Sequence, residues 1–252
     1  MTIESVLILA VGVAAGTVNT VVGSGSLLTF PTLIALGYPP LIANVSNNIG
    51  LAPGSISGAI GYRRELAGQR ALAMRLGVAA AAGGAIGAAL LLLLPASAFE
   101  RIVPVLILVA CGLVIAQPRL SAMARVRAAG RHERQGMDPL LPLAVTGTGV
   151  YGGYFGAAQG VILMALLGVL VDDELQRINA LKNVLTAIVN GTAAVIFALT
   201  TPVAWDAVVL LAIGSVIGGQ LGARIGRRIP PTLLRVAIVT VGLLVVLRYL
   251  VR

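Results

Sequence analysis

Ten apolar runs joined by short polar loops dominate this sequence. A helix needs about 20 apolar residues to cross the hydrocarbon core of a bilayer, and most of the runs have about that length. Hydrophobic residues make up 58% of the 252-residue chain and charged residues 11%, whereas soluble domains carry about 25% charged residues. The sequence therefore predicts an all-α fold, a polytopic membrane helix bundle. The approximate limits of the runs are 3–22, 26–36, 40–62, 73–94, 98–116, 139–156, 158–170, 175–199, 205–223 and 231–250.

Two of these runs, 26–36 and 158–170, are too short to cross the core. Each follows a longer run after a glycine-containing break, which reads Gly23-Ser24-Gly25-Ser26 in the first case and Gly156-Ala157-Ala158-Gln159-Gly160 in the second. Unpaired backbone groups at membrane depth are tolerated only against protein or a water-filled cavity. We therefore expect each pair to form a broken helix hairpin.

Four sequence features recur in the same order in the two halves of the chain. They are Gly16 and Gly23 matched by Gly149 and Gly156, Asn47 matched by Asn183, Gly83-Gly84-x-x-Gly87 matched by Gly218-Gly219-x-x-Gly222, and Pro95 matched by Pro230. Five segments per half would invert the second copy in the bilayer and give an inverted-topology repeat. We expect a first membrane repeat at 1–116, a basic cytoplasmic linker at 117–138 and a second membrane repeat at 139–252.

The net charge of +9 resides in short loops between the apolar runs. The loops at 63–75 and 224–228 are basic, and so is the expected linker, whose arginines are Arg119, Arg125, Arg127, Arg131 and Arg134. With each broken pair taken as a hairpin, the positive-inside rule places all three on the cytoplasmic side and both termini outside. This predicts a multi-pass protein of a bacterial cytoplasmic (inner) membrane and no nucleic-acid binding. The first run lacks the basic region of a secretory signal, so we expect it to be retained.

Patterns typical of enzymes and metal sites are missing from the sequence. There is no Gly-Lys-Ser/Thr phosphate loop, the only histidine is His132 in the linker, and Cys111 is the only cysteine. The stretch 147–152 matches a dinucleotide fingerprint by letter, but it lies in an apolar helix with no preceding strand. We therefore expect no enzyme, no cofactor and no metal.

Polar side chains form stripes in two of the apolar runs. Run 175–199 carries Asn179, Asn183, Thr186 and Asn190 on one helical face, and run 40–62 carries Asn44, Asn47, Asn48 and Ser55. Such groups are costly to bury without partners. They indicate either hydrogen bonds between helices or the lining of a solute cavity, and a row of four beside a cation favours the cavity.

The cation is Lys182, the only lysine among 18 lysines and arginines. It lies about two turns into an apolar run. Two interpretations are open: a side chain that reaches to the interface, or a cation that binds an anion from the cavity.

The starts of the two short helices complete the expected site. A helix N-terminus carries free N–H groups and about half a positive charge, so it binds anions. In an inverted repeat the starts near Ser26 and Gln159 would meet at the midplane from opposite sides. Such a site suits a small oxyanion, such as a sulfonate, sulfite or carboxylate, and does not suit a metal ion or an organic cation. We expect the substrate to be bound by Ser24, Gly25, Ser26, Asn47, Asn48, Gln159, Lys182, Asn183 and Asn190.

At these residues the sequence resembles the sulfite exporter TauE/SafE family, also called the toluene sulfonate uptake permease family. The resemblance is carried by the stretch 23–31, which reads GSGSLLTFP, by Gly37-Tyr38-Pro39-Pro40, by 152–156, which reads GGYFG, and by Lys182-Asn183. Ser24 and Ser26 interrupt a glycine run of the family, and Ala158-Gln159 departs from its second motif. The resemblance implies transport of sulfur-containing or small organic anions across the cytoplasmic membrane.

Our hypothesis is a secondary transporter that exports sulfite, sulfonates or sulfoacetate-like anions by alternating access. Each negative charge that leaves a negative-inside cell gains about 2.3 kcal/mol per 100 mV, so export of an anion needs no coupling ion. The partners expected are a small anionic substrate, the lipid bilayer and a second copy of the chain in a homodimer. The alternatives are a carrier of another small metabolite with a five-plus-five repeat, an anion channel, or a subunit of a larger complex.

Overall fold

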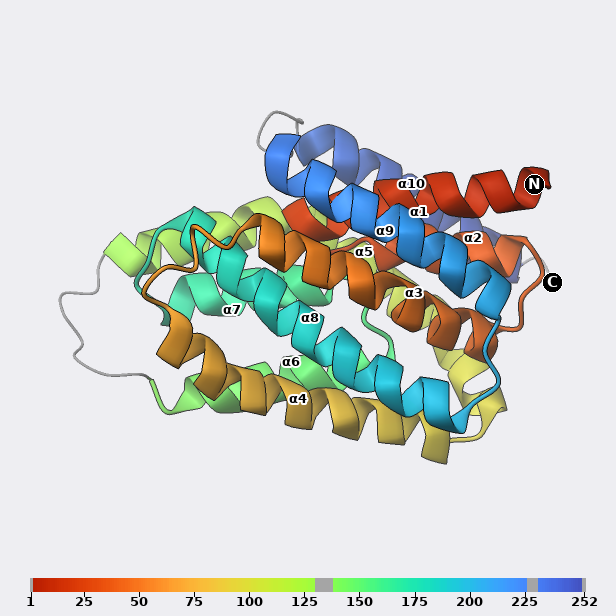
Figure 1. Ribbon diagram of the computed structural model, residues 1–252, viewed down its shortest axis with the longest axis horizontal. Helices are drawn as coiled ribbons and strands as arrows, with labels where there is room; N and C mark the ends of the chain where they lie inside the picture. Colours follow the sequence, from red (N-terminus) through yellow and green to blue (C-terminus); the bar gives the residue numbers. More distant parts are fainter. Residues whose placement is uncertain (1, 130–137, 226–230, 251–252) are drawn as a thin grey trace.

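Helices account for the secondary structure throughout the part of the chain that the computed structural model describes, which is residues 2–129, 138–225 and 231–250 (Figure 1). The described residues form no strand, so the all-α prediction is confirmed. The helices are α1 (Ile3–Val21), α2 (Ser26–Ala35), α3 (Pro40–Gly61), α4 (Arg70–Leu93), α5 (Ala96–Ala129), α6 (Leu140–Tyr154), α7 (Gln159–Leu170), α8 (Leu175–Thr200), α9 (Trp205–Ile225) and α10 (Pro231–Leu250).

These helices follow the ten apolar runs closely, with one extension. Helix α5 continues past the apolar run at 98–116 to Ala129, so helix also occupies much of the range 117–138 that we expect to be a linker. Some residues of the basic loops lie outside the described residues. They are Arg131, His132 and Arg134 of the expected linker and the loop residues 226–228.

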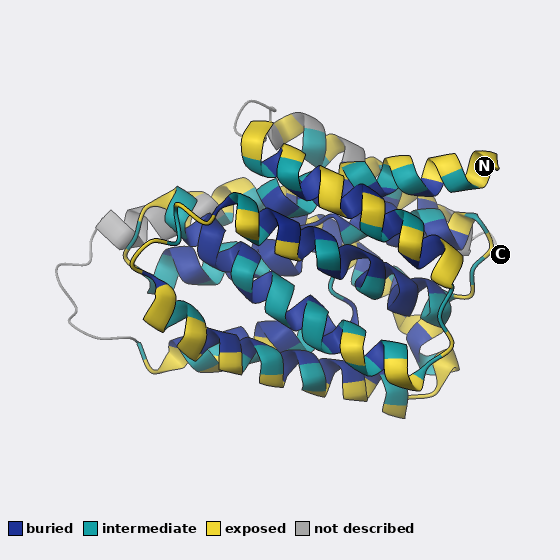
Figure 2. Cartoon of the chain, in the orientation of Figure 1, coloured by how far each residue is buried: buried dark blue, intermediate teal, exposed yellow. Residues whose placement is uncertain are grey.

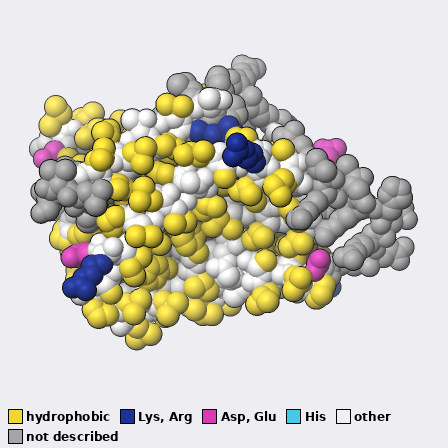
Figure 3. All heavy atoms as spheres, turned by 180° about the vertical axis from the view of Figure 1, so that it is seen from behind, with side chains coloured by type: hydrophobic (Ala, Val, Ile, Leu, Met, Phe, Trp, Pro, Cys, Tyr) yellow, Lys and Arg dark blue, Asp and Glu magenta, His cyan; other side chains and the backbone are white. Residues whose placement is uncertain are grey.

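The outer surface of the bundle is apolar, which is the reverse of a soluble protein. Val78, Leu93 and Leu199 are among many large hydrophobic side chains that point outward, and in the described part of the face in Figure 3 hydrophobic side chains far outnumber charged ones. The described residues include five helices that are long and apolar enough to cross a membrane: Ile3–Val21, Arg70–Leu93, Ala96–Leu120, Leu175–Thr200 and Trp205–Ile225. The fold is therefore that of a multi-pass membrane protein.

Close helix pairs form the interior of the bundle. Helix α1 packs on α9, α4 packs on α6, and α3 and α8 lie between these pairs (Figure 1). Their buried faces turn toward one another (Figure 2). A Cβ atom on Gly218 would lie 2.1 Å from the carbonyl oxygen of Val13, and one on Gly83 would lie 2.3 Å from that of Thr146. These are matched glycines of the two sequence halves, and each permits close contact of its helix pair.

The basic loops gather at one end of the bundle. The α3–α4 loop, the end of α5 and the end of α9 lie together there, and the start of α1 and the end of α10 lie at the opposite end (Figure 1). At the terminal end, the Tyr38 hydroxyl donates to Asp206 Oδ2 (2.7 Å). Burial, and then the neighbouring Asp206 carboxylate, raise the pKa of Tyr38 to about 12. That the basic loops share the cytoplasmic side of the membrane stays a prediction.

Asp173 fixes the start of α8 at the basic end. Its carboxylate accepts hydrogen bonds from Arg177 Nε (2.6 Å), Gln69 Nε2 (2.7 Å) and the Glu174 backbone amide (2.8 Å). Arg177 Nη1 also donates to the Ala67 carbonyl oxygen (2.9 Å). Burial alone raises the pKa of Asp173, but these hydrogen bonds outweigh it and hold the pKa below its ordinary value.

We expect Asp173→Asn to destabilise the protein by about 1 kcal/mol at pH 7, because the amide cannot accept from all three donors as a carboxylate does. A lowered pKa means that the carboxylate stabilises the fold above its unfolded pKa of about 4 and that this stabilisation is lost as the pH falls further. Melting temperatures in detergent should therefore differ between Asp173→Asn and the parent at pH 7 and converge in acid. The control is Asp172→Asn, which changes an exposed neighbour; an equal effect of the two variants at pH 7 would contradict this role.

Candidate functional site

The two glycine breaks meet through their backbones inside the bundle. The amide of Gly160, in the first turn of α7, donates to the carbonyl oxygen of Gly23 between α1 and α2 (3.0 Å). A Cβ atom on Gly23 would lie 2.5 Å from Gly160 Cα, and one on Gly160 would lie 2.4 Å from Gly23 Cα. No side chain fits between the two segments. The starts of the short helices, which lie 133 residues apart in sequence, are thus adjacent in space.

Unusual backbone conformations produce both breaks. Gly23 and Gly156 end the long helices with φ of 88° and 76°, and Ala158 has φ of 60° immediately before α7. A left-handed conformation costs about 1–2 kcal/mol for a residue with a Cβ atom, so Ala158 is held by its surroundings. The Tyr151 hydroxyl supports this segment by donating to the Ala157 carbonyl oxygen (2.6 Å).

Polar groups of α8 bind the end of α1 just before the first break. Lys182 Nζ donates to the carbonyl oxygens of Asn19 (3.1 Å) and Thr20 (3.2 Å). The Thr20 carbonyl also accepts from Asn183 Nδ2 (3.3 Å) and Asn179 Nδ2 (3.4 Å). These carbonyls form the negative end of the α1 dipole, where a cation is favourable. Lys182 is only 1% exposed, so it does not reach to the interface.

Ser55 of α3 links α1 to α8 beside this contact. Its hydroxyl oxygen accepts from Asn19 Nδ2 (3.1 Å) and Asn190 Nδ2 (3.2 Å), and the hydroxyl donates to the Leu51 carbonyl oxygen (3.1 Å). Three helices therefore meet at one hydroxyl group, and the polar stripes of α3 and α8 face the same region.

Asn44 and Asn47 extend the α3 stripe toward the second break and α2. Asn44 Nδ2 donates to the Tyr154 carbonyl oxygen at the end of α6 (3.0 Å). The Thr29 hydroxyl of α2 donates to Asn47 Oδ1. The end of α6 is therefore bound by α3, as the end of α1 is bound by α8.

Several buried polar atoms of the two breaks, of α3 and of α8 have no hydrogen-bond partner among the described residues. They are Ser24 Oγ, Gln159 Nε2, Asn48 Oδ1, Asn179 Oδ1 and Thr186 Oγ1. Leaving such an atom unsatisfied costs about 1–3 kcal/mol, and a cluster of them is typical of a place where a polar ligand or water binds. We call the cluster formed by the breaks and the polar faces of α3 and α8 the central polar cluster.

The nine residues expected to bind substrate fall into two groups. Gly25, Ser24 and Ser26 belong to the first break, Gln159 starts α7, and Lys182, Asn183 and Asn190 contact the end of α1 directly or through Ser55. Asn47 instead bonds to α2, and Asn48 lies buried next to it on α3.

Two residues of the breaks, Gly25 and Gln159, pack against neighbouring helices in this conformation. A Cβ atom on Gly25 would lie 2.3 Å from the Ala15 carbonyl oxygen, and one on Gly152 would lie 2.4 Å from the Gln159 side chain. Gly25 therefore packs on α1 and Gln159 packs on α6. The Gly160 amide is likewise occupied by Gly23, so the start of α7 has one amide fewer to offer a ligand.

Three residues that make contacts in this region, Asn19, Thr20 and Thr29, are not predicted from the sequence. The sequence does contain an indication for Asn19, because a polar asparagine stands inside an apolar run, four positions before Gly23. Thr20 acts through its backbone carbonyl, which every residue possesses, so its side chain gave no signal for this contact. Thr29 is a single hydroxyl in an apolar helix, and only the packing of α2 on α3 shows its partner.

Most of the central polar cluster is closed to solvent in this conformation. Ser24, Gln159 and Lys182 are buried, whereas Ser26 is partly exposed. The cluster offers hydroxyl and amide groups and one ammonium group, and the named residues include no carboxylate. It is chemically suited to hydrogen bonding with a ligand rather than to acid–base catalysis.

Comparisons with known proteins agree with this architecture. The family model of the sulfite exporter TauE/SafE matches residues 8–249. The probable membrane transporter protein YfcA of Escherichia coli (strain K12) is 28% identical over 220 residues, which cover 85% of this chain and 78% of that protein. A probable membrane transporter protein of Haemophilus influenzae is 26% identical over 239 residues, covering 92% of this chain and 89% of that protein.

A third relative, the probable membrane transporter protein ORF9 of Sinorhizobium sp, is 23% identical over 236 residues, covering 94% of this chain and 88% of that protein. No solved structure matches the chain. The family match extends over almost the whole bundle, including both glycine breaks and the polar faces of α3 and α8. The chain belongs to the sulfite exporter TauE/SafE family and is a multi-pass membrane transporter, not an enzyme.

Proposed function

We propose that the protein exports small oxyanions, namely sulfite, sulfonates or sulfoacetate-like anions, by alternating access around the central polar cluster. The observation that carries the proposal is the buried cation next to the joined breaks. The two hydrogen bonds of Lys182 go to backbone carbonyl oxygens, and among the described residues no carboxylate forms an ion pair with its ammonium group. A buried charge without a counter-ion favours an anionic ligand.

The donors in the cluster fit an oxyanion. An ammonium group has three N–H bonds, and Lys182 uses two of them on Asn19 and Thr20. Gln159 Nε2 and Ser24 Oγ are buried without partners and are able to donate. Hydrogen bonds between a cation and an oxyanion are about twice as strong as neutral ones, so the third N–H of Lys182 is the main contact that we propose.

The pattern of helix contacts supports two halves related as an inverted repeat. If each helix of the first half is exchanged with the helix five places later, the α1–α9 pair becomes α6–α4 and the α3–α9 pair becomes α8–α4. All four pairs are in close contact. The matched contacts of Gly83 and Gly218 follow the same exchange. In such transporters, rocking of one repeat against the other exposes a central site to each side in turn.

Membrane potential alone is sufficient to drive the export. A dianion that leaves a negative-inside cell gains about 4.6 kcal/mol per 100 mV, or roughly a thousandfold in concentration ratio. The described part of α8 and α3 supplies no carboxylate for a proton relay, which favours an uncoupled carrier.

Efflux from proteoliposomes tests the proposed function. Vesicles containing the purified protein are loaded with sulfite or sulfoacetate, and a potassium gradient with valinomycin sets the potential. We expect efflux that accelerates with an inside-negative potential and shows counterflow. Protein-free vesicles are the control.

Three results would contradict this function. Efflux that does not respond to potential would contradict uncoupled electrogenic export. Rapid flux without counterflow would instead identify an anion channel. A failure to move any sulfur oxyanion, with flux of another metabolite, would favour a carrier of that metabolite.

A further inference from the structure

Two adjoining pockets lie away from the central polar cluster, on the outside of the bundle near its basic end. The first is an apolar groove of about 460 Å³ between α3 and α8. It is lined by Ile56 and Ile60 of α3, by Val184, Ala187 and Ile188 of α8, and by Arg63 at one end. Ile56 and Ile60 are about half exposed, so this surface faces the lipid.

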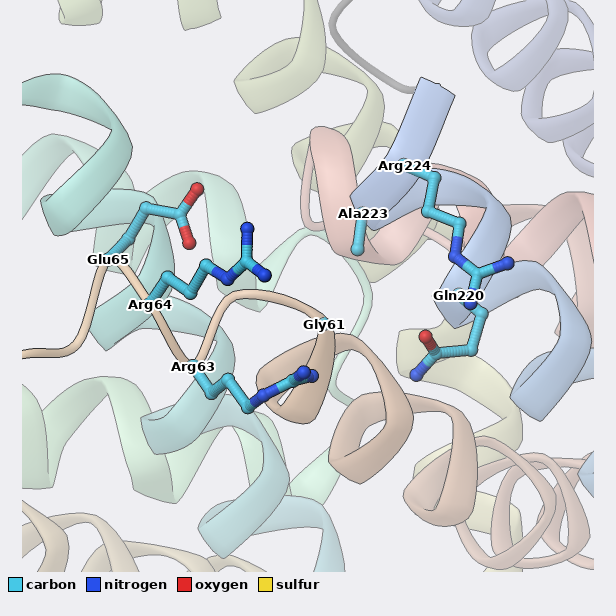
Figure 4. A pocket seen from close by; sticks show the side chains of 7 residues that line it. All are labelled: Gly61, Arg63, Arg64, Glu65, Gln220, Ala223 and Arg224. Carbon is cyan, nitrogen blue, oxygen red and sulfur yellow. The ribbon is translucent and has the colours of Figure 1, made fainter.

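The second pocket, of about 390 Å³, is lined by arginines. Arg63 and Arg64 come from the loop after α3, whereas Gln220 and Arg224 come from the end of α9 (Figure 4). In Figure 4, Arg63 and Arg64 extend in the direction of the α9 side of the pocket. Glu65 is the one acidic residue in the lining, so positive charge dominates.

Arg63 belongs to both pockets and therefore joins an apolar groove to a basic pocket. Its Nη1 donates to the Ile60 carbonyl oxygen (3.4 Å), so its side chain lies back along the end of α3. A molecule that fills both pockets must have a long apolar part and an anionic head. A small soluble oxyanion could pair with the arginines, but it has no apolar part to fill the groove.

We infer that this composite surface binds an anionic phospholipid, with an acyl chain in the α3–α8 groove and its phosphate at Arg63 and Arg64. Guanidinium groups pair well with phosphate oxygens. Basic pockets beside membrane helices on the cytoplasmic side bind anionic head groups, and the basic end of this bundle is the end that we expect to face the cytoplasm. The site is independent of which solute the protein transports.

The groove lies behind the central polar cluster. Ala187 and Ile188 follow Thr186 on α8, and Ile56 follows Ser55 on α3. The lipid therefore contacts the outer side of the two helices whose inner sides carry the polar stripes.

Native mass spectrometry of the purified protein with added phosphatidylglycerol or phosphatidylcholine tests the lipid site. An arginine near the membrane surface contributes about 1 kcal/mol of attraction to anionic lipid, which is about fivefold in affinity. We expect the double variant Arg63→Gln/Arg64→Gln to bind phosphatidylglycerol about 25-fold more weakly than the parent does. The matched control is Arg75→Gln, an exposed arginine of α4 outside both pockets, and it should change the affinity less than twofold.

A second pair of variants tests the groove without changing charge. Ala187→Trp fills the groove and should weaken phosphatidylglycerol binding, whereas Ala82→Trp, on the exposed side of α4, should not. Thermal unfolding checks that each variant is folded, and the arginine variants decide the question if Ala187→Trp does not fold.

Glycerol 1-phosphate distinguishes a lipid from a free phosphate compound. We expect it to compete only weakly with phosphatidylglycerol, because it lacks the acyl chains. Competition at equal concentration would overturn the lipid assignment in favour of a soluble phosphate. Equal binding of phosphatidylglycerol and phosphatidylcholine, or equal affinity of the double variant and Arg75→Gln, would overturn the site.

Discussion

Gly160→Ala is expected to lower the stability of the protein by about 3 kcal/mol or more and to abolish transport. The new Cβ atom would lie 2.4 Å from Gly23 Cα, and backbone atoms cannot rotate away as a side chain does. The two breaks would have to separate, which removes the hydrogen bond from the Gly160 amide to the Gly23 carbonyl oxygen. Urea or thermal unfolding in detergent and vesicle transport measure the two effects.

Gly191→Ala and Gly147→Ala are the matched controls. Both glycines lie inside helices, and a Cβ atom on either meets nothing within 4 Å. Alanine is a better helix former than glycine by about 1 kcal/mol, so these variants should be as stable as the parent or more stable. If Gly160→Ala retained the melting temperature and transport rate of Gly191→Ala, the backbone contact between the breaks would not be required.

The second large effect is expected for Lys182→Met, which should raise the KM for sulfite at least tenfold. Methionine has a similar length and no charge, so the change removes the ammonium group without opening a large cavity. The loss of one charged hydrogen bond to an anion corresponds to about 1.5–3 kcal/mol, which is about tenfold to a hundredfold in affinity. Initial rates of uptake or efflux over a range of sulfite concentrations give the KM.

Stability measurements distinguish this role from a purely structural one. Without Lys182, the Thr20 carbonyl keeps its hydrogen bonds from Asn179 and Asn183, so we expect a loss of only about 1–2 kcal/mol in stability. Arg119→Gln, an exposed charge of α5, is the control at matched expression. An unchanged KM in Lys182→Met would remove the lysine from the binding site, whatever happens to its stability.

The helices and their breaks were predictable because hydropathy and glycine positions are local properties of the sequence. Apolar runs at 26–36 and 158–170 became α2 and α7 almost residue for residue. Helix α5 was underestimated because hydropathy falls after residue 116, whereas alanine, arginine and methionine in the following segment remain good helix formers. The apolar run therefore ends at residue 116, whereas the helix continues to Ala129.

The contacts inside the central polar cluster were predictable only in part. Side-chain stripes indicated which faces of α3 and α8 turn inward, and Asn190 and Asn183 lie on those faces. The partners of Lys182 are backbone carbonyls at the end of α1, and a carbonyl has no sequence signature. Gly25 is a similar case. The sequence predicts that it approaches a ligand, whereas in the structure it approaches Ala15. The packing of α2 against α1 decides this neighbour, and the sequence does not show that packing.

Anomalous diffraction from crystals grown with selenite, a selenium analogue of sulfite, is the most direct measurement of where an oxyanion binds. The account predicts a selenium peak in the central polar cluster, with an oxygen about 3 Å from Lys182 Nζ, and predicts its disappearance in Lys182→Met. A peak confined to the arginine pocket at Arg63 and Arg64, or an unchanged peak in Lys182→Met, would contradict it.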